Sequence, residues 1–130
     1  MKENLKNIIR PTHLLPLLAL ALMLGSTAPA SAVFPLNYSW SCTSRTCSFS
    51  VTTSNHGAYQ WGFGDGTSSS KTTSTTANHF YNIPIDEQFH TFNVTLSGYA
   101  TINSTSPDNI IGCNISVAAS SLGIGTSGTC

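Results

Sequence analysis

Beyond its first quarter, this chain alternates apolar residues with polar or small ones. A period of two puts successive side chains on opposite faces of a β-strand, so such a segment predicts a strand with one apolar face. Five segments show this pattern: 34–40, 47–52, 59–63, 92–96 and 111–117. No stretch after residue 32 has the apolar spacing of an amphipathic helix. The alternation therefore predicts an all-β fold of half-buried strands.

Turn signals separate these segments. Asn55-His56-Gly57, Gly64-Asp65-Gly66 and Ser106-Pro107-Asp108-Asn109 combine the residues that favour tight turns. The polar segment 67–77 fits either an edge strand or a long loop. Short strands at this spacing predict a β-sandwich of about seven strands over residues 33–118. Residues 119–130 are small and rich in Gly and Ser, and this composition predicts a flexible tail.

The first 32 residues differ from the rest. Lys2, Lys6 and Arg10 precede an apolar run over 14–24, and small residues follow it. A basic segment, a short apolar segment and an A-x-A site predict a secretory signal peptide, cleaved after Ala30 or Ala32. The alternative is an uncleaved membrane anchor, but the run is short beside the roughly 20 residues of a spanning helix. We expect no stable membrane insertion after cleavage, and a secreted or periplasmic location.

Charge is sparse beyond the signal segment. The charged residues there are Arg45, Asp65, Lys71, Asp86, Glu87 and Asp108. Binding to nucleic acid or to anionic lipid depends on clustered Lys and Arg, so neither partner is expected. The polar coat is mostly Ser, Thr and Asn.

All four cysteines lie in the predicted exported part, where disulfides form. Cys42 and Cys47 enclose four residues between two alternating segments, which favours a bridge across a turn. Cys113 lies on an apolar stripe and Cys130 ends the sequence. These two either pair with each other or leave Cys113 as a buried thiol.

The segment YQWGFGDGTS around Trp61 resembles the hallmark of PKD (polycystic kidney disease) domains, W-x-F-G-D-G. His79 and Tyr81 match the H-x-Y of that family, and TFNVTL matches its T-Y-x-V-T-L strand, with Phe92 in place of Tyr. The hairpin with Cys42 and Cys47 is similar to the first hairpin of bacterial members. The resemblance extends over most of the chain after residue 33.

This resemblance implies an Ig-like β-sandwich of a bacterial, single-domain secreted type. It also implies structural roles for the matched residues, which are Trp61, Phe63, Gly64, Asp65, Gly66, His79, Tyr81, Phe92, Val94 and Leu96. Members of the family mediate extracellular protein or carbohydrate contacts. No acid lies in the segment before Trp61, so no calcium site is predicted.

Asp65 between two glycines is the residue most like a catalytic group. We favour the alternative that it is a turn residue whose carboxylate accepts nearby backbone N–H groups. The three histidines after residue 33, His56, His79 and His90, match no metal-ligand spacing, and no nucleophile motif is present. We therefore predict no catalytic residue, no metal and no cofactor. An enzyme would need Asp65, His79 and a serine to cluster.

Binding residues are expected away from the apolar stripes. Trp61 follows the inward alternation and is predicted to lie in the core, whereas Phe80, Phe89 and Tyr99 lie off the stripes or near strand ends and are the candidate surface aromatics. The sequence thus favours a non-catalytic module that binds an extracellular protein or polysaccharide. The alternative is a spacer or subunit of a cell-envelope assembly.

Overall fold

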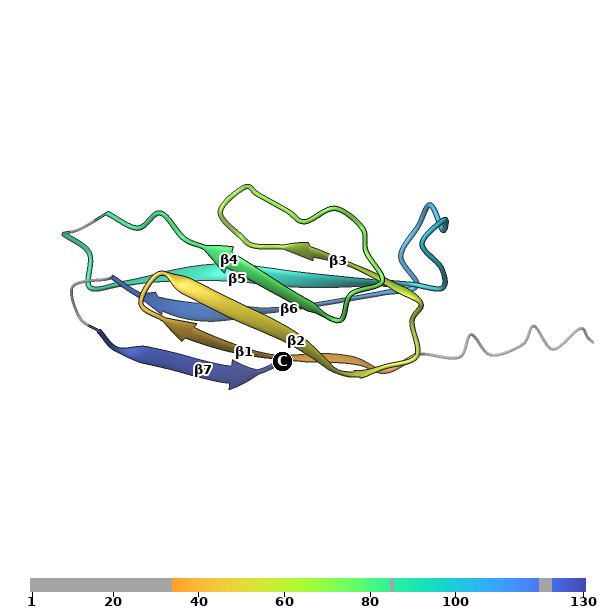
Figure 1. Cartoon of the computed structure of the whole chain (residues 1–130), viewed down its shortest axis with the longest axis horizontal. Coiled ribbons are helices and arrows are strands. Elements are labelled where there is room, and N and C mark those ends of the chain that lie inside the picture. Colours follow the sequence, from red (N-terminus) through yellow and green to blue (C-terminus); the bar gives the residue numbers. More distant parts are fainter. Residues whose placement is uncertain (1–33, 85, 120–122) are drawn as a thin grey trace, which may run out of the picture. The chain divides into compact units, whose positions relative to one another are not determined.

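A computed structural model describes residues 34–84, 86–119 and 123–130, and these residues form seven strands and no helix (Figure 1). The strands are β1 (Leu36–Thr43), β2 (Thr46–Ser54), β3 (Ala58–Gly62), β4 (Thr76–Phe80), β5 (Phe89–Tyr99), β6 (Asn109–Ala118) and β7 (Gly125–Thr129). Every pairing between them is antiparallel.

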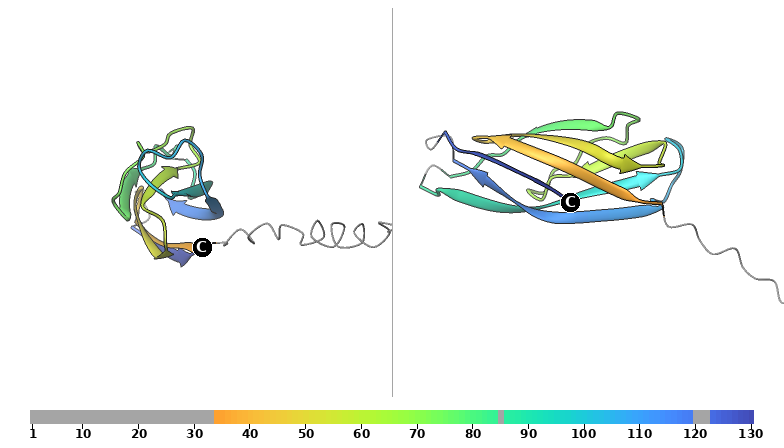
Figure 2. Two further views of the ribbon diagram at one scale, coloured as in Figure 1. Left: turned by 90° about the vertical axis from the view of Figure 1, so that its right-hand side faces the viewer. Right: turned by 90° about the horizontal axis from the view of Figure 1, so that it is seen from below.

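The strands make two sheets. One sheet has the order β4-β2-β1-β7 and the other the order β3-β5-β6. The two sheets form two layers, as the end-on view in Figure 2 shows. Their apolar side chains make one buried cluster. The predicted β-sandwich is confirmed, and the Ig-like expectation fits this two-sheet arrangement.

The core lies where the inward stripes of both sheets meet. Trp61 of β3 is fully buried, and its ring lies 5.1 Å from that of Tyr38 of β1 and 5.4 Å from that of Phe49 of β2. The nearly perpendicular Trp61–Tyr38 arrangement, at 84°, is favourable for aromatic pairs. The Tyr38 hydroxyl donates a hydrogen bond of 2.8 Å to the carbonyl of Val94 on β5, so the two layers are joined by polar as well as apolar contact.

Both cysteine pairs are disulfide bonds. Cys42 and Cys47 face each other across the β1–β2 hairpin, and Cys113 of β6 is joined to Cys130 just after β7. Two disulfides in one small domain indicate a compartment outside the reducing cytoplasm.

The prediction of a flexible tail over 119–130 is wrong for the residues that the structure describes there. Strand β7 pairs with β1 over five residues, and Cys130 exchanges two backbone hydrogen bonds with Tyr38 (2.8 and 3.1 Å). The sandwich therefore extends to the last residue rather than ending at 118. Alternation gave no signal for this strand because its side chains are all small.

The polar segment 67–77 divides into two parts. Its beginning bridges to β3 through Tyr59↔Thr72 and Gly62↔Ser68, which covers the edge of that strand. Its end enters β4, which pairs with β2. Both readings of the segment, edge strand and loop, therefore hold for different residues.

The predicted signal peptide, residues 1–32, lies outside the described residues. Among the residues that are described, no helix is long and apolar enough to cross a membrane.

Candidate functional site

The WGFGDG motif of residues 61–66 lies where β3 leaves its sheet. Trp61 and Phe63 point into the core, and the two glycines that follow adopt positive φ, +81° at Gly64 and +88° at Gly66. Only glycine enters this backbone region at little cost. A Cβ on Gly64 would lie 2.6 Å from the carbonyl oxygen of Asn93, so the turn also packs closely on β5.

Asp65 forms the centre of this turn. Its Oδ1 accepts hydrogen bonds from the backbone N–H of Thr67 at 3.0 Å and from the hydroxyl of Thr67 at 2.6 Å. Its Oδ2 lies 2.7 Å from Nε2 of His79 on β4. One carboxylate oxygen therefore stabilises the turn itself, and the other joins the turn to a strand of the other sheet.

His79 is held by aromatic rings. It stacks on Phe63 with 4.0 Å between ring centroids, and the edge of Tyr81 meets it at 86°. The Tyr81 hydroxyl donates to the Phe63 carbonyl at 2.9 Å, and burial together with the Asp65 charge raises its pKa, so it stays protonated. The fold thus brings Asp65 and His79 together, as an enzyme would require. However, none of the hydrogen bonds among the described residues joins a serine to His79.

Acid unfolding tests the role of Asp65. Burial raises the pKa of its carboxyl, but hydrogen bonds from Thr67 and His79 outweigh burial, and the net pKa is below the ordinary 3.8. The unfolded chain therefore takes up the proton more readily. The stabilisation is complete above about pH 5 and is lost as the pH falls through the lowered pKa.

We expect Asp65→Asn to flatten the fall in stability between pH 5 and pH 2, measured by urea unfolding. The effect should be at most about 1 kcal/mol, because the pair is partly exposed to solvent and screened. Equal pH dependence in the two proteins would contradict this role for the carboxylate.

The three candidate surface aromatics behave differently. Phe80 is 60% exposed and Phe89 is 46% exposed, so both are available to a ligand. Tyr99 is only 6% exposed, and its candidacy as a surface aromatic is wrong. Its hydroxyl donates to the side-chain oxygen of Gln60 at 2.9 Å, and the Lys71 ammonium covers its ring at 4.0 Å. The bridging segment after β3, which carries Lys71, covers this ring, and the sequence did not show that coverage.

A larger feature lies on the outer face of the β4-β2-β1-β7 sheet. Strand register aligns two rows of polar side chains across all four strands. One row is Thr76–Ser50–Ser39–Thr129, and the other is Asn78–Ser48–Ser41–Ser127. We call these eight residues the hydroxyl face. Within a row, residues on neighbouring strands are about 4.8 Å apart. The two rows are two residues apart along each strand, which is about 6.7 Å.

The middle of the hydroxyl face is hollowed. A shallow depression of about 320 Å³ is lined by six residues of the face and by Trp40 and Phe49 beneath it. Most of the hydroxyls make no hydrogen bond to another described side chain. The exceptions are Ser48, which donates to Asn78 at 2.7 Å, and Thr76, whose hydroxyl lies 3.4 Å from that of Ser74. The remaining hydroxyls of the face are therefore free to bind a ligand.

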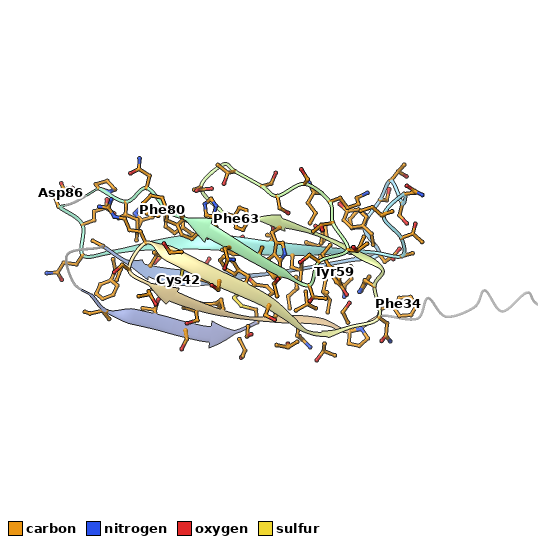
Figure 3. All side chains as sticks on the ribbon, in the orientation of Figure 1. Phe34, Cys42, Tyr59, Phe63, Phe80 and Asp86 are labelled. Atoms are coloured by element: carbon orange, nitrogen blue, oxygen red, sulfur yellow. A yellow bond between two sulfur atoms is a disulfide. The ribbon has the colours of Figure 1, made fainter. Side chains whose placement is uncertain are left out.

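Phe80 extends this face. It follows Asn78 by two residues on β4, so it projects on the same side of the sheet, opposite Thr46 of β2. Figure 3 shows Phe80 toward the end of the sandwich that carries Asp86, away from Phe34 and Tyr59. The hydroxyl face thus has an exposed aromatic ring at one corner.

None of the seven strands contains an Asp, Glu, Lys or Arg residue. The Asp, Glu, Lys and Arg side chains among the described residues lie in turns and connecting segments, at Arg45, Asp65, Lys71, Asp86, Glu87 and Asp108. Sheet proteins commonly use charged residues to keep strands from associating. A sheet without them is suited to contact with an uncharged partner.

The three histidines that the structure describes form no shared site. His56 is buried beside Ser54, whose hydroxyl lies 2.9 Å from Nδ1, and His90 pairs with Glu87 at 2.6 Å near the start of β5. Nowhere in the described part of the chain do three potential metal ligands gather.

The hydroxyl face could be predicted from the sequence only in part. Ser39 and Ser41, and likewise Ser48 and Ser50, alternate with the apolar stripe of their strands, so their outward direction follows from the pattern. Their alignment with β4 and β7 depends on strand pairing, which the alternation does not specify.

Comparison with known proteins found no match among protein-family models, curated proteins or solved structures.

Proposed function

We propose that this protein is a secreted, non-catalytic module of the PKD type, and that its hydroxyl face binds a neutral extracellular polysaccharide. The observation that carries the proposal is the pair of hydroxyl and amide rows around an open depression, on a sheet without charge. The signal-like N-terminal sequence and the resemblance of residues 61–66 to PKD domains support the secreted module.

Sugar hydroxyls both donate and accept hydrogen bonds, and so do the Ser and Thr side chains of the face. Binding a neutral polysaccharide removes water from no charged group. A charged ligand would need an opposite charge on the protein to offset the cost of its desolvation, and this face has none. The exposed ring of Phe80 offers an apolar surface to the C–H face of a sugar at the corner of the array.

The Asp65–His79 pair is the observation closest to catalysis. Its ring stacking, its two anchored carboxylate oxygens and its place within a tight turn support a structural role. We therefore assign binding rather than chemistry to the protein.

Retention on insoluble polysaccharide tests the proposal. We expect the purified protein to bind at least one of cellulose, chitin and a neutral β-glucan, with little change between low and high salt because no ion pair is involved. Collagen serves as the protein arm of the same assay. Retention on collagen alone, or on none of the four, would overturn the proposal.

A pair of matched variants locates the site. Ser41→Asp puts a charge at the middle of the hydroxyl face and is expected to weaken retention at least tenfold. Thr91→Asp makes a similar change at an exposed outward position of β5 on the other sheet and should leave retention unaltered. Equal losses in both variants, with both folded, would show that the hydroxyl face is not the site.

A further inference from the structure

The two disulfides differ in what they hold and in how exposed they are. Cys42 and Cys47 are fully buried and join two residues already paired within one hairpin. Cys113 and Cys130 are partly exposed, and they join β6 of one sheet to the end of β7 in the other. A reductant therefore has better access to the second pair.

Strand β7 has few other attachments. Its sequence, GTSGT, places only Thr126 and Gly128 toward the interior. The Thr126 hydroxyl donates to the Ser116 carbonyl at 2.6 Å, and Gly128 lies against the indole of Trp40. No large apolar side chain of β7 is buried, and glycine is a poor strand residue, so the backbone ladder to β1 does most of the noncovalent holding.

The same strand supplies one end of both polar rows. Ser127 pairs with Ser41, and Thr129 pairs with Ser39. If β7 leaves β1, the hydroxyl face loses these two side chains and β1 becomes an open edge. The integrity of the face therefore depends on how firmly β7 is held.

We propose that the Cys113–Cys130 disulfide is a redox latch that controls the hydroxyl face. To open the latch, a thiolate of an external dithiol attacks one sulfur of the pair and forms a mixed disulfide with it. The Cys113–Cys130 bond breaks in this step, and the other cysteine sulfur leaves as a thiolate that takes up a proton from water. The second thiol of the reagent then displaces the protein sulfur. The reagent leaves as a disulfide, and Cys113 and Cys130 are left as two thiols. Strand β7 then separates from β1 while the Cys42–Cys47 bond and the rest of the sandwich persist.

Graded reduction with dithiothreitol, followed by alkylation and peptide mass analysis, tests the first step. Cys113 and Cys130 are expected to become alkylated at a lower reductant concentration than Cys42 and Cys47. Simultaneous reduction of both bonds with global unfolding would overturn the latch.

Hydrogen exchange tests the second step. After selective reduction, the amides of 125–129 are expected to exchange at least tenfold faster, with the amides of β2 and β5 unchanged. The double variant Cys113→Ser with Cys130→Ser should show the same exchange without any reductant. Unchanged protection of β7 in either the reduced protein or the variant would refute the proposal.

The effect on binding rests on the proposed function, and retention on the polysaccharide is expected to fall several-fold when the latch opens. The exchange measurement separates the two proposals. If the oxidised protein binds no polysaccharide but β7 is released by reduction, only the proposed function fails. If it binds and retention survives reduction with β7 still protected, only the latch fails.

Discussion

Replacing Trp61 by alanine is expected to remove about 3–5 kcal/mol from the free energy of unfolding, a large share of the roughly 5–15 kcal/mol of a typical small domain. The indole is fully buried and fills the space between the two sheets against Tyr38 and Phe49. Its removal leaves a cavity that two paired sheets cannot close without moving their strands.

The measurement is urea unfolding followed by circular dichroism. Trp61→Phe is the matched control and should cost clearly less, because a ring still fills most of the space. The indole N–H has no hydrogen-bond partner among the described residues, so phenylalanine sacrifices no such bond there. A loss below about 1 kcal/mol for Trp61→Ala would mean that the core does not depend on this ring.

The second large effect is expected for Gly64→Ala. At φ +81°, a side chain costs about 1–3 kcal/mol in backbone strain. Its Cβ would also lie 2.6 Å and 2.8 Å from the backbone oxygen and nitrogen of Asn93, which cannot move without disturbing β5. Overpacking of this kind adds a further 1–3 kcal/mol or so.

Gly66→Ala separates these two causes. Gly66 has a similar φ, +88°, but a Cβ there would meet nothing within 4 Å. Its cost should therefore be the backbone strain alone. Thermal and urea unfolding of the two variants give the comparison, and a loss at Gly66 as large as that at Gly64 would rule out close packing on β5 as the reason for the first glycine.

Prediction from the sequence succeeded where strands have one apolar face. The residues that alternate around Phe49, Trp61 and Val94 are indeed buried, and the segments that contain them are β2, β3 and β5. Strands β4 and β7 were not recognised as distinct strands. The inward positions of β4 are Ala77 and His79, and those of β7 are Thr126 and Gly128, so neither carries a stripe of large apolar side chains.

The candidate site was predictable only in part. Phe80 was expected to be exposed, and it is, because it lies between the inward residues His79 and Tyr81. Tyr99 was expected to be exposed as well, but a segment nearly thirty residues earlier in the chain covers its ring with Lys71. The alternation of residues around Tyr99 gives no information about coverage by a segment distant in the chain.

By itself, the sequence of this protein determined the strands that carry an apolar stripe, which of their faces turn inward and where the chain turns. Those properties follow from the alternation of side chains and from the glycines at residues 64 and 66, both of which act within a few residues. Tertiary structure alone decided that Asp65 meets His79, that four strands align their polar rows, and that the last strand joins β1. Each of these contacts joins segments distant in the chain, and their register comes from how two sheets pack together rather than from any local preference.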